Sequence, residues 1–305
     1  MLDPKAVGGG HLLQRAGILN AIRNFFIQHD YLEVETPIRI PAPAPEAHID
    51  AIPSETWYLH TSPELCMKRL LAAGYEKLFQ ICKCFRKNER GNRHLPEMTL
   101  LEWYSAHQDY YQMMNQCEAL ITFVVNTLYR SSTITYQKKS IDLTRPWPKL
   151  SVAQAFDRYA QCPAEVALKK GRFDEVMALQ IEPHLGWEQP IFLHDYPSAC
   201  GALARLKSDN TDVAERFELY IGGLELCNGF SELTDPVEQR QRFEAETEIR
   251  RKAGKATYPL PESFLDALAH MPEATGNALG VDRLVMLLTD TQCIDDVVAF
   301  TPERI

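Results

Sequence analysis

Two apolar stretches on either side of an arginine-rich loop constrain the fold of this chain more than any other feature. Residues 77–86 and 98–105 are mostly apolar, whereas the segment between them is dense in cationic and carboxylate side chains. The pattern predicts two strands of one sheet joined by a charged loop. Because an Arg fork matches two phosphate oxygens at once, such a loop suits a polyphosphate ligand.

A second arginine, Arg283, follows a glycine-punctuated segment far along the chain. A lone arginine at the position of Arg86 would more often form a surface ion pair than bind phosphate. The loop after Arg86 also carries Lys87 and His94, which favours binding of the α-phosphate of ATP and stabilisation of the charge that develops there. Arg86 and Arg283 together indicate an ATP-using ligase.

Composition places the chain among globular proteins and argues against a large nucleic-acid surface and a membrane segment. The 305 residues are 45% apolar and 24% charged, and a net charge of −9 disfavours a large nonspecific nucleic-acid surface. No apolar run approaches the roughly 20 residues of a membrane helix, and no signal peptide is visible. We therefore expect a cytoplasmic protein with no membrane segment and a flexible lead-in at residues 1–10.

The eight cysteines are scattered and include no Cys-x-x-Cys pair. Neither a zinc site nor a disulfide framework is predicted from that spacing. We expect reduced thiols, as is usual for a cytosolic protein.

Periodicity and turn residues predict strands separated by loops and hairpins, with few crossover helices. This pattern favours an α+β fold with an antiparallel sheet flanked by helices. The expected helices are 11–30, 62–73, 112–129, 236–252, 262–270 and 282–290, together with a helical insert at 151–185. The expected strands are 31–38, 57–61, 77–86, 98–105, 216–221, 224–227 and 275–281.

Two groups of carboxylates are candidates for ligand binding. Glu218 and Glu225 flank the turn of the 216–227 hairpin, where they would suit Mg²⁺ shared with nucleotide phosphates; two solvated glutamates are an equally good interpretation. Glu64, Glu102 and Glu232 form the second group, and Glu102 lies in an apolar strand where a charge needs a cation. That cation is either an internal Lys or Arg, the usual case, or the ammonium of a diamino acid substrate.

These residues together resemble the catalytic domain of class II aminoacyl-tRNA synthetases of subclass b, nearest to the lysyl enzymes. YLEVETP resembles motif 1, the segment from Phe85 to Glu102 motif 2, and GNALGVDRLVML motif 3; TSPELCMKRL and FELYIGGLELCNGFSELTD resemble the lysine-type enzymes specifically. The resemblance covers residues 11–305. It implies one catalytic domain over that range, with the helical insert inside it, and a homodimer formed through the motif 1 region.

The resemblance also implies residue roles. Arg86 and Arg283 would hold the phosphates of ATP, and Glu218 and Glu225 would hold Mg²⁺. The implied nucleotide-binding residues are Arg86, Lys87, Asn88, His94, Leu95, Met98, Glu225, Leu226, Gly280 and Arg283. The implied amino-acid-binding residues are Ser62, Pro63, Glu64, Glu102, Tyr104, Asn228, Glu232 and Ala278, with Glu102, Tyr104 and Glu232 around the side-chain ammonium.

Two departures from the lysyl enzymes carry information. The first catalytic helix begins within about a dozen residues of Met1, so we expect no anticodon-binding barrel and little tRNA binding. A stand-alone catalytic domain resembles the paralogue that ligates (R)-β-lysine to a lysine of translation elongation factor P. Ala278 stands where lysyl enzymes usually have glycine, which is consistent with a substrate amine moved by one carbon.

Three alternatives stay open from the sequence. One is a truncated lysyl-tRNA synthetase-like enzyme that charges tRNA, and another is a small-molecule amide synthetase. The third is a regulatory domain that binds lysine or ATP without chemistry, which the presence of Arg86, Glu225 and Arg283 disfavours.

Overall fold

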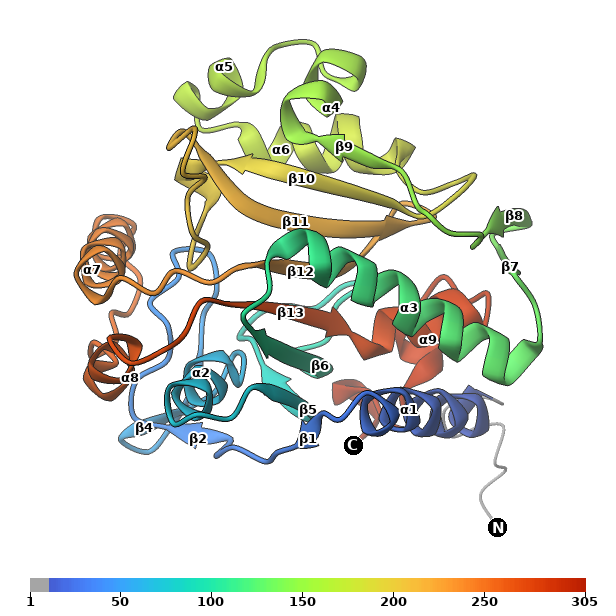
Figure 1. The fold of residues 1–305 in the computed structure, drawn as a ribbon, viewed down its shortest axis with the longest axis horizontal. Coiled ribbons are helices and arrows are strands. Elements are labelled where there is room, and N and C mark those ends of the chain that lie inside the picture. Colours follow the sequence, from blue (N-terminus) through green and yellow to red (C-terminus); the bar gives the residue numbers. More distant parts are fainter. Residues whose placement is uncertain (1–10) are drawn as a thin grey trace.

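An eight-stranded sheet forms the centre of the molecule, which a computed structural model describes for residues 11–305 (Figure 1). The predicted lead-in at residues 1–10 lies outside the described residues. The strands follow the order β1-β5-β6-β13-β12-β11-β10-β9. Their bounds are β1 Leu32–Glu33, β5 Lys77–Phe85, β6 Glu97–Ala106, β9 Lys149–Ser151, β10 Ile191–Pro197, β11 Val213–Ile221, β12 Leu224–Ser231 and β13 Ala274–Gly280. Two small sheets lie beside it, built from β2 Arg39–Ile40, β3 Ile52–Ser54 and β4 Trp57–Leu59, and from β7 Thr133–Tyr136 and β8 Lys139–Asp142.

The expected antiparallel sheet is present in the six central strands, from β5 to β10. At the two edges β1 pairs with β5 and β9 pairs with β10 in parallel, so the whole sheet is mixed. A parallel pair needs a crossover connection instead of a hairpin. The chain supplies one through α2 Glu64–Ala72 and the other through α4 Val152–Tyr159, α5 Ala164–Lys169 and α6 Phe173–Val176.

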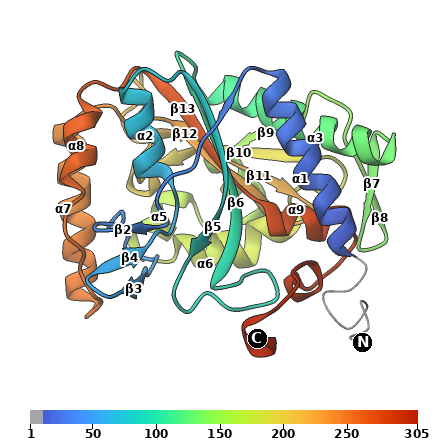
Figure 2. The ribbon, with the colours of Figure 1, turned by 90° about the horizontal axis from the view of Figure 1, so that it is seen from below.

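Helices cover both faces of the sheet (Figures 1 and 2). On one face α1 His11–Gln28, α3 Tyr110–Tyr129 and α9 Val281–Leu288 bury the main apolar core, in which Phe26 stacks on Phe79 with ring centroids 4.7 Å apart. On the other face α2 packs with α7 Pro236–Lys252 and α8 Glu262–Leu268 around a smaller core. The residues over β9 and β10 form a third cluster. No helix among residues 11–305 combines the length and hydropathy that a membrane span requires.

Most predicted elements are present with shifted ends. The segment 31–38 is mainly irregular and keeps only β1, whose pairing is limited to Leu32 with Leu78 and Glu33 with Phe79 of β5. Helix α3 begins at Tyr110, earlier than expected, because Asp109 forms a capping box with Gln112. Pro63 occupies the cap position of α2, while the hydroxyl of Ser62 accepts from the Glu64 N–H at 3.0 Å.

Candidate active site

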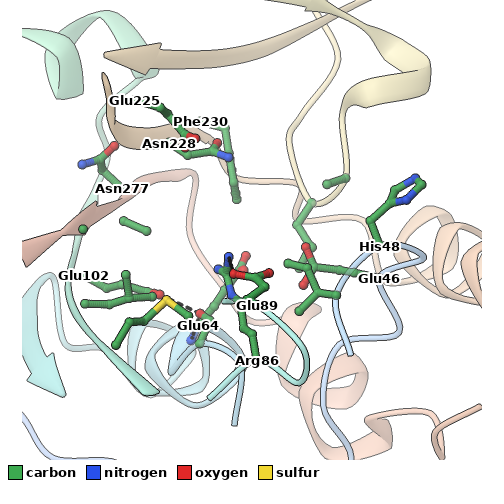
Figure 3. Close-up of a pocket in the computed structure, with 18 of the residues that line it drawn as sticks. Glu46, His48, Glu64, Arg86, Glu89, Glu102, Glu225, Asn228, Phe230 and Asn277 are labelled. Carbon is green, nitrogen blue, oxygen red and sulfur yellow. Dashed lines mark hydrogen bonds and ion pairs between the residues drawn. The ribbon is translucent and has the colours of Figure 1, made fainter. Parts of the chain in front are cut away.

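A cavity of about 560 Å³ lies on the face of the sheet that carries α2 and α7 (Figure 3). Fourteen of the predicted site residues line it: Ser62, Glu64, Arg86, His94, Leu95, Met98, Glu102, Tyr104, Glu225, Leu226, Asn228, Ala278, Gly280 and Arg283. Five predicted residues are outside the lining: Pro63, Lys87, Asn88, Glu218 and Glu232. In Figure 3 Glu102 and Glu46 lie on opposite sides of the cavity.

Strand register explains why residues so distant in sequence meet here. Residues paired directly across neighbouring strands point to the same face of a sheet. Glu102 pairs with Ala278, Ala278 with Asn228, and Asn228 with Glu218. These residues form one row across β6, β13, β12 and β11. The row contains residues predicted to bind the amine of the substrate, its carboxylate and the metal.

Glu102 is buried and hydrogen-bonded at one end of the cavity. Its two oxygens accept from the hydroxyls of Ser62 at 2.7 Å and Tyr104 at 2.8 Å, and only 2% of the residue is exposed. Burial, together with the nearby charge of Glu64, raises the pKa of Glu102 to about 8. Burial therefore favours the protonated form of Glu102, and a cation entering the pocket would favour loss of that proton.

An internal lysine partly fills the need for a cation that the three glutamates create. Lys68 is buried and forms ion pairs with Glu64 at 2.5 Å and with Glu232. Glu232 is 1% exposed, and burial raises its pKa to about 8. Glu102 has no ion-pair partner among residues 11–305, so a substrate ammonium is the cation that would allow it to ionise. Both cations that the sequence left open, an internal lysine and a substrate ammonium, are compatible with this arrangement.

Gly276 lets Glu232 and Tyr104 approach each other at the base of this cluster. A Cβ atom there would overlap the Tyr104 ring and a carboxylate oxygen of Glu232. By contrast, a Cβ at Gly280 would meet only the side chain of Arg283, at 3.7 Å or more. The absence of a side chain at Gly276 is thus needed for packing against Tyr104 and Glu232. At Gly280 there is room for a methyl group.

Two arginines mark the opposite end of the cavity. Arg86 has only a long ion pair with Glu89 at 3.8 Å, and its buried Nε finds no partner among residues 11–305. Arg283 donates to the carbonyl of Glu225 at 2.9 Å and contacts the Glu225 carboxylate at 3.2 Å and His94 Nε2 at 2.6 Å. Burial and the charge of Arg283 lower the pKa of His94, which favours the neutral imidazole. At this end the Arg86 guanidinium has free hydrogen-bonding capacity, whereas Arg283 is already held by Glu225, His94 and the carbonyl of Arg93.

The predicted metal carboxylates lie beside these arginines but differ in availability. Glu225 lines the cavity, whereas Glu218 is held by Arg216, Tyr196 and Tyr220 at 2.6 Å each. Burial and repulsion from Glu218 and Glu225 raise the pKa of Glu182 to about 7. A hard cation would relieve that repulsion, so the donor set fits Mg²⁺, which takes one or two carboxylates plus phosphates.

Sequence reasoning missed three residues of the site. Lys68 is one turn along α2 from Glu64, a spacing that predicts an i,i+4 pair. Arg216 is two residues before Glu218, on the same face of β11. Glu46 lies in a Pro-Ala loop without any pattern, and burial raises its pKa to about 7. Only the tertiary structure shows that Glu46 faces the cavity.

Comparison with known proteins agrees with the geometry. Residues 9–304 match the family model "tRNA synthetases class II (D, K and N)". The elongation factor P–(R)-β-lysine ligases of Edwardsiella ictaluri and Pectobacterium carotovorum are 38% and 40% identical to this chain, covering 96% of it and 95% of each relative. The lysine–tRNA ligase of Moorella thermoacetica is 38% identical over 96% of this chain but only 65% of its own length.

Proposed function

The chain belongs to the class II tRNA synthetases of the D, K and N type, and we propose that it ligates a lysine-type amino acid to a lysine side chain of elongation factor P. The observation that carries the proposal is a cavity with opposite chemistry at its two ends. Three acidic side chains with one lysine among them lie at one end, and two arginines, of which Arg86 has a free donor, lie at the other. A diamino acid and ATP fit those ends with their reacting groups between them.

In the first step a carboxylate oxygen of the amino acid attacks the α-phosphorus of ATP. The bond to the β-phosphate oxygen breaks and pyrophosphate leaves, so an aminoacyl-adenylate remains. Arg86 and Arg283 would hold the phosphates and stabilise the charge that develops, and Asn228 would orient the carboxylate. Mg²⁺ held by Glu225 and Glu218 would supply charge neutralisation on the phosphates.

In the second step the acceptor amine attacks the acyl carbonyl, and AMP leaves. The attacking amine must be neutral and must lose a proton as the amide forms. Glu46 is suited to accept that proton, because it lines the cavity opposite Glu102 and has a pKa of about 7. No covalent enzyme intermediate is needed.

Ala278 supports β-lysine over α-lysine. It lies directly between Glu102 and Asn228 in the strand register, so its methyl group occupies the line from the ammonium site to the carboxylate site. We propose that this methyl group disfavours an α-amine and accommodates an amine one carbon further along.

Assembly is the remaining part of the proposal. Leu32 and Ile38, in and beside the motif 1 segment, are 49% and 43% exposed. Such apolar exposure is consistent with a homodimer formed through this segment. Light scattering should give the mass of two chains, and a monomeric mass would overturn this part.

The proposal is tested by ATP–pyrophosphate exchange with L-lysine and with (R)-β-lysine, followed by intact-mass analysis of elongation factor P. Exchange with (R)-β-lysine and a matching mass gain on the factor are expected. Exchange with L-lysine alone and charging of lysine tRNA would overturn the proposal in favour of the activity named for the Moorella relative.

A further inference from the structure

We propose that His60, Cys82 and Cys84 form a binding site for one thiophilic cation of the Zn²⁺ class behind the nucleotide end of the cavity. Over residues 11–305 this is the one group of three metal-binding side chains whose ligand atoms all lie within 4.8 Å of one another. The site is independent of the proposed ligase activity, and no residue of the cluster belongs to the cavity lining.

The backbone places the two thiols on one face. Cys82 and Cys84 are alternate residues of β5, so their side chains point to the same side of the sheet. Their sulfur atoms are 3.8 Å apart. His60 approaches from the segment before α2, with Nε2 also 3.8 Å from the sulfur of Cys84.

These separations match tetrahedral coordination. With Zn–S bonds of about 2.3 Å and Zn–N bonds of about 2.0–2.1 Å, two sulfurs lie about 3.8 Å apart and sulfur and nitrogen about 3.6 Å apart. The distance between the two sulfurs and the distance from the Cys84 sulfur to His60 Nε2, both 3.8 Å, are within a few tenths of an ångström of these values. A soft thiolate pair with imidazole selects Zn²⁺ or Cu⁺ over Mg²⁺ or Ca²⁺.

A fourth polar residue lies beside the cluster in β5. Gln80 precedes Cys82 by two residues on the same face of β5 and is 2% exposed. Its Oε1 finds no hydrogen-bond donor within the described part of the chain. An unpaired buried amide oxygen is costly, and a metal, directly or through a bound water, would satisfy it.

Metal entry would require loss of protons from the cluster. His60 Nε2 now donates to the carbonyl of Lys83 at 2.7 Å, so binding would break that bond and release its proton to solvent. Remaining thiol protons would also leave to solvent. Cys82 is partly exposed, which gives the ion a route in.

The location connects the site to the cavity wall. Cys82 pairs across the sheet with Leu100 and Cys84 with Met98, and both partners line the cavity. The segment of His60 leads directly to Ser62 and Glu64. A bound ion would therefore fasten this segment to β5 and stabilise the folded chain.

The test uses the full chain, reduced and stripped by a chelator, with Co²⁺ as the spectroscopic probe. Wild type should show a thiolate-to-cobalt charge-transfer band and tetrahedral d–d bands, which one equivalent of Zn²⁺ removes. Since outer-shell changes alone cost about 10–100-fold in metal affinity, Cys82→Ser and Cys84→Ser should each cost at least about 100-fold. Cys293→Ser, a partly exposed free thiol outside the cluster, should keep wild-type affinity.

Two further readouts keep the proposal falsifiable if a variant folds poorly. Zinc-edge X-ray absorption of the wild-type protein should report two sulfur ligands and at least one nitrogen ligand. Zn²⁺ should raise the melting temperature of wild type and Cys293→Ser but not of Cys84→Ser. Absence of the charge-transfer band in wild type, its survival in Cys84→Ser, or a zinc shell without sulfur would each overturn the site.

Discussion

The two ends of the cavity are lined by side chains of opposite charge type, and they differ in how fully their polar groups are partnered within the protein. At the amine end Glu102, Glu232 and Lys68 are buried, the side chain of Glu64 is 17% exposed, and burial favours the protonated form of Glu102. At the phosphate end the arginines are partly exposed, and Arg86 has no short partner among the residues described. A buried site is rigid and selective, because each unpaired group there is costly. The more open site suits a large anion whose own oxygens complete the hydrogen bonds.

Arg86→Ala tests the phosphate end and should have the largest effect. Loss of a preorganised donor to the developing charge should lower pyrophosphate exchange by about 10²–10³-fold while the chain folds normally. Arg90→Ala is the matched control, because Arg90 belongs to the same loop but pairs with Glu303 and Asp295 outside the cavity. Wild-type exchange in Arg86→Ala would remove this residue from the mechanism.

Glu102→Gln tests the amine end. Losing one charged hydrogen-bond partner should weaken binding of the diamino acid by about 1.5–3 kcal/mol in calorimetry, with ATP affinity unchanged. Glu232→Gln should weaken binding less, because Glu232 acts on the pocket through Lys68.

Glu215→Gln is the control for both variants, since Glu215 pairs with Arg205 away from the cavity. Unchanged affinity for the amino acid in both Glu102→Gln and Glu232→Gln would refute the assignment of this end.

Gly276→Ala and Gly280→Ala compare the packing of the two ends. The added methyl at Gly276 overlaps Tyr104 and Glu232, so a loss of about 1–3 kcal/mol in unfolding free energy and weaker amine binding are expected. The methyl at Gly280 meets only ordinary contacts and should leave both quantities close to wild type. Denaturant unfolding and calorimetry measure the pair, and equal effects at the two positions would contradict the difference in packing.

The smallest effect is a pH dependence of amine binding. The folded-state pKa of Glu102, about 8, lies above its ordinary value. The ionised form of Glu102 binds an ammonium, so the affinity for the amino acid should rise by up to tenfold per pH unit from about pH 6.5 to about pH 8. For the same reason Glu102 makes folding stability fall as pH rises from about 4.5 to about 8.

Titration of the wild-type protein in buffers with different ionisation enthalpies should detect proton release when the amino acid binds. Glu102→Gln should lose both the proton release and the Glu102 contribution to the pH dependence. A flat affinity profile for wild type would show that Glu102 is already ionised.

Local patterns were sufficient for much of the fold. Strand periodicity gave the hairpin around residues 222–223, and the start of α7 follows from the Asp235-Pro236 cap that precedes it. The prediction of a strand over residues 31–38 was wrong because only two of these residues pair, and their partners are in a distant strand, β5. The parallel pairing of the two edge strands, β1 and β9, was missed for the same reason. The direction of pairing depends on where the connecting segment brings the chain back to the sheet.

The sequence by itself determined which chemical groups this protein brings to its cavity: the arginines of the charged loop and strand–helix junction, and the carboxylates of separate strands. Residue type and local spacing are enough for that. Only the tertiary structure decided how those groups are partnered. Lys68 meets Glu232 and His60 meets Cys82 and Cys84 across separate elements, and the scattered cysteines carried no such signal. Contacts between elements depend on strand register and helix packing, which cooperative burial of the whole core fixes.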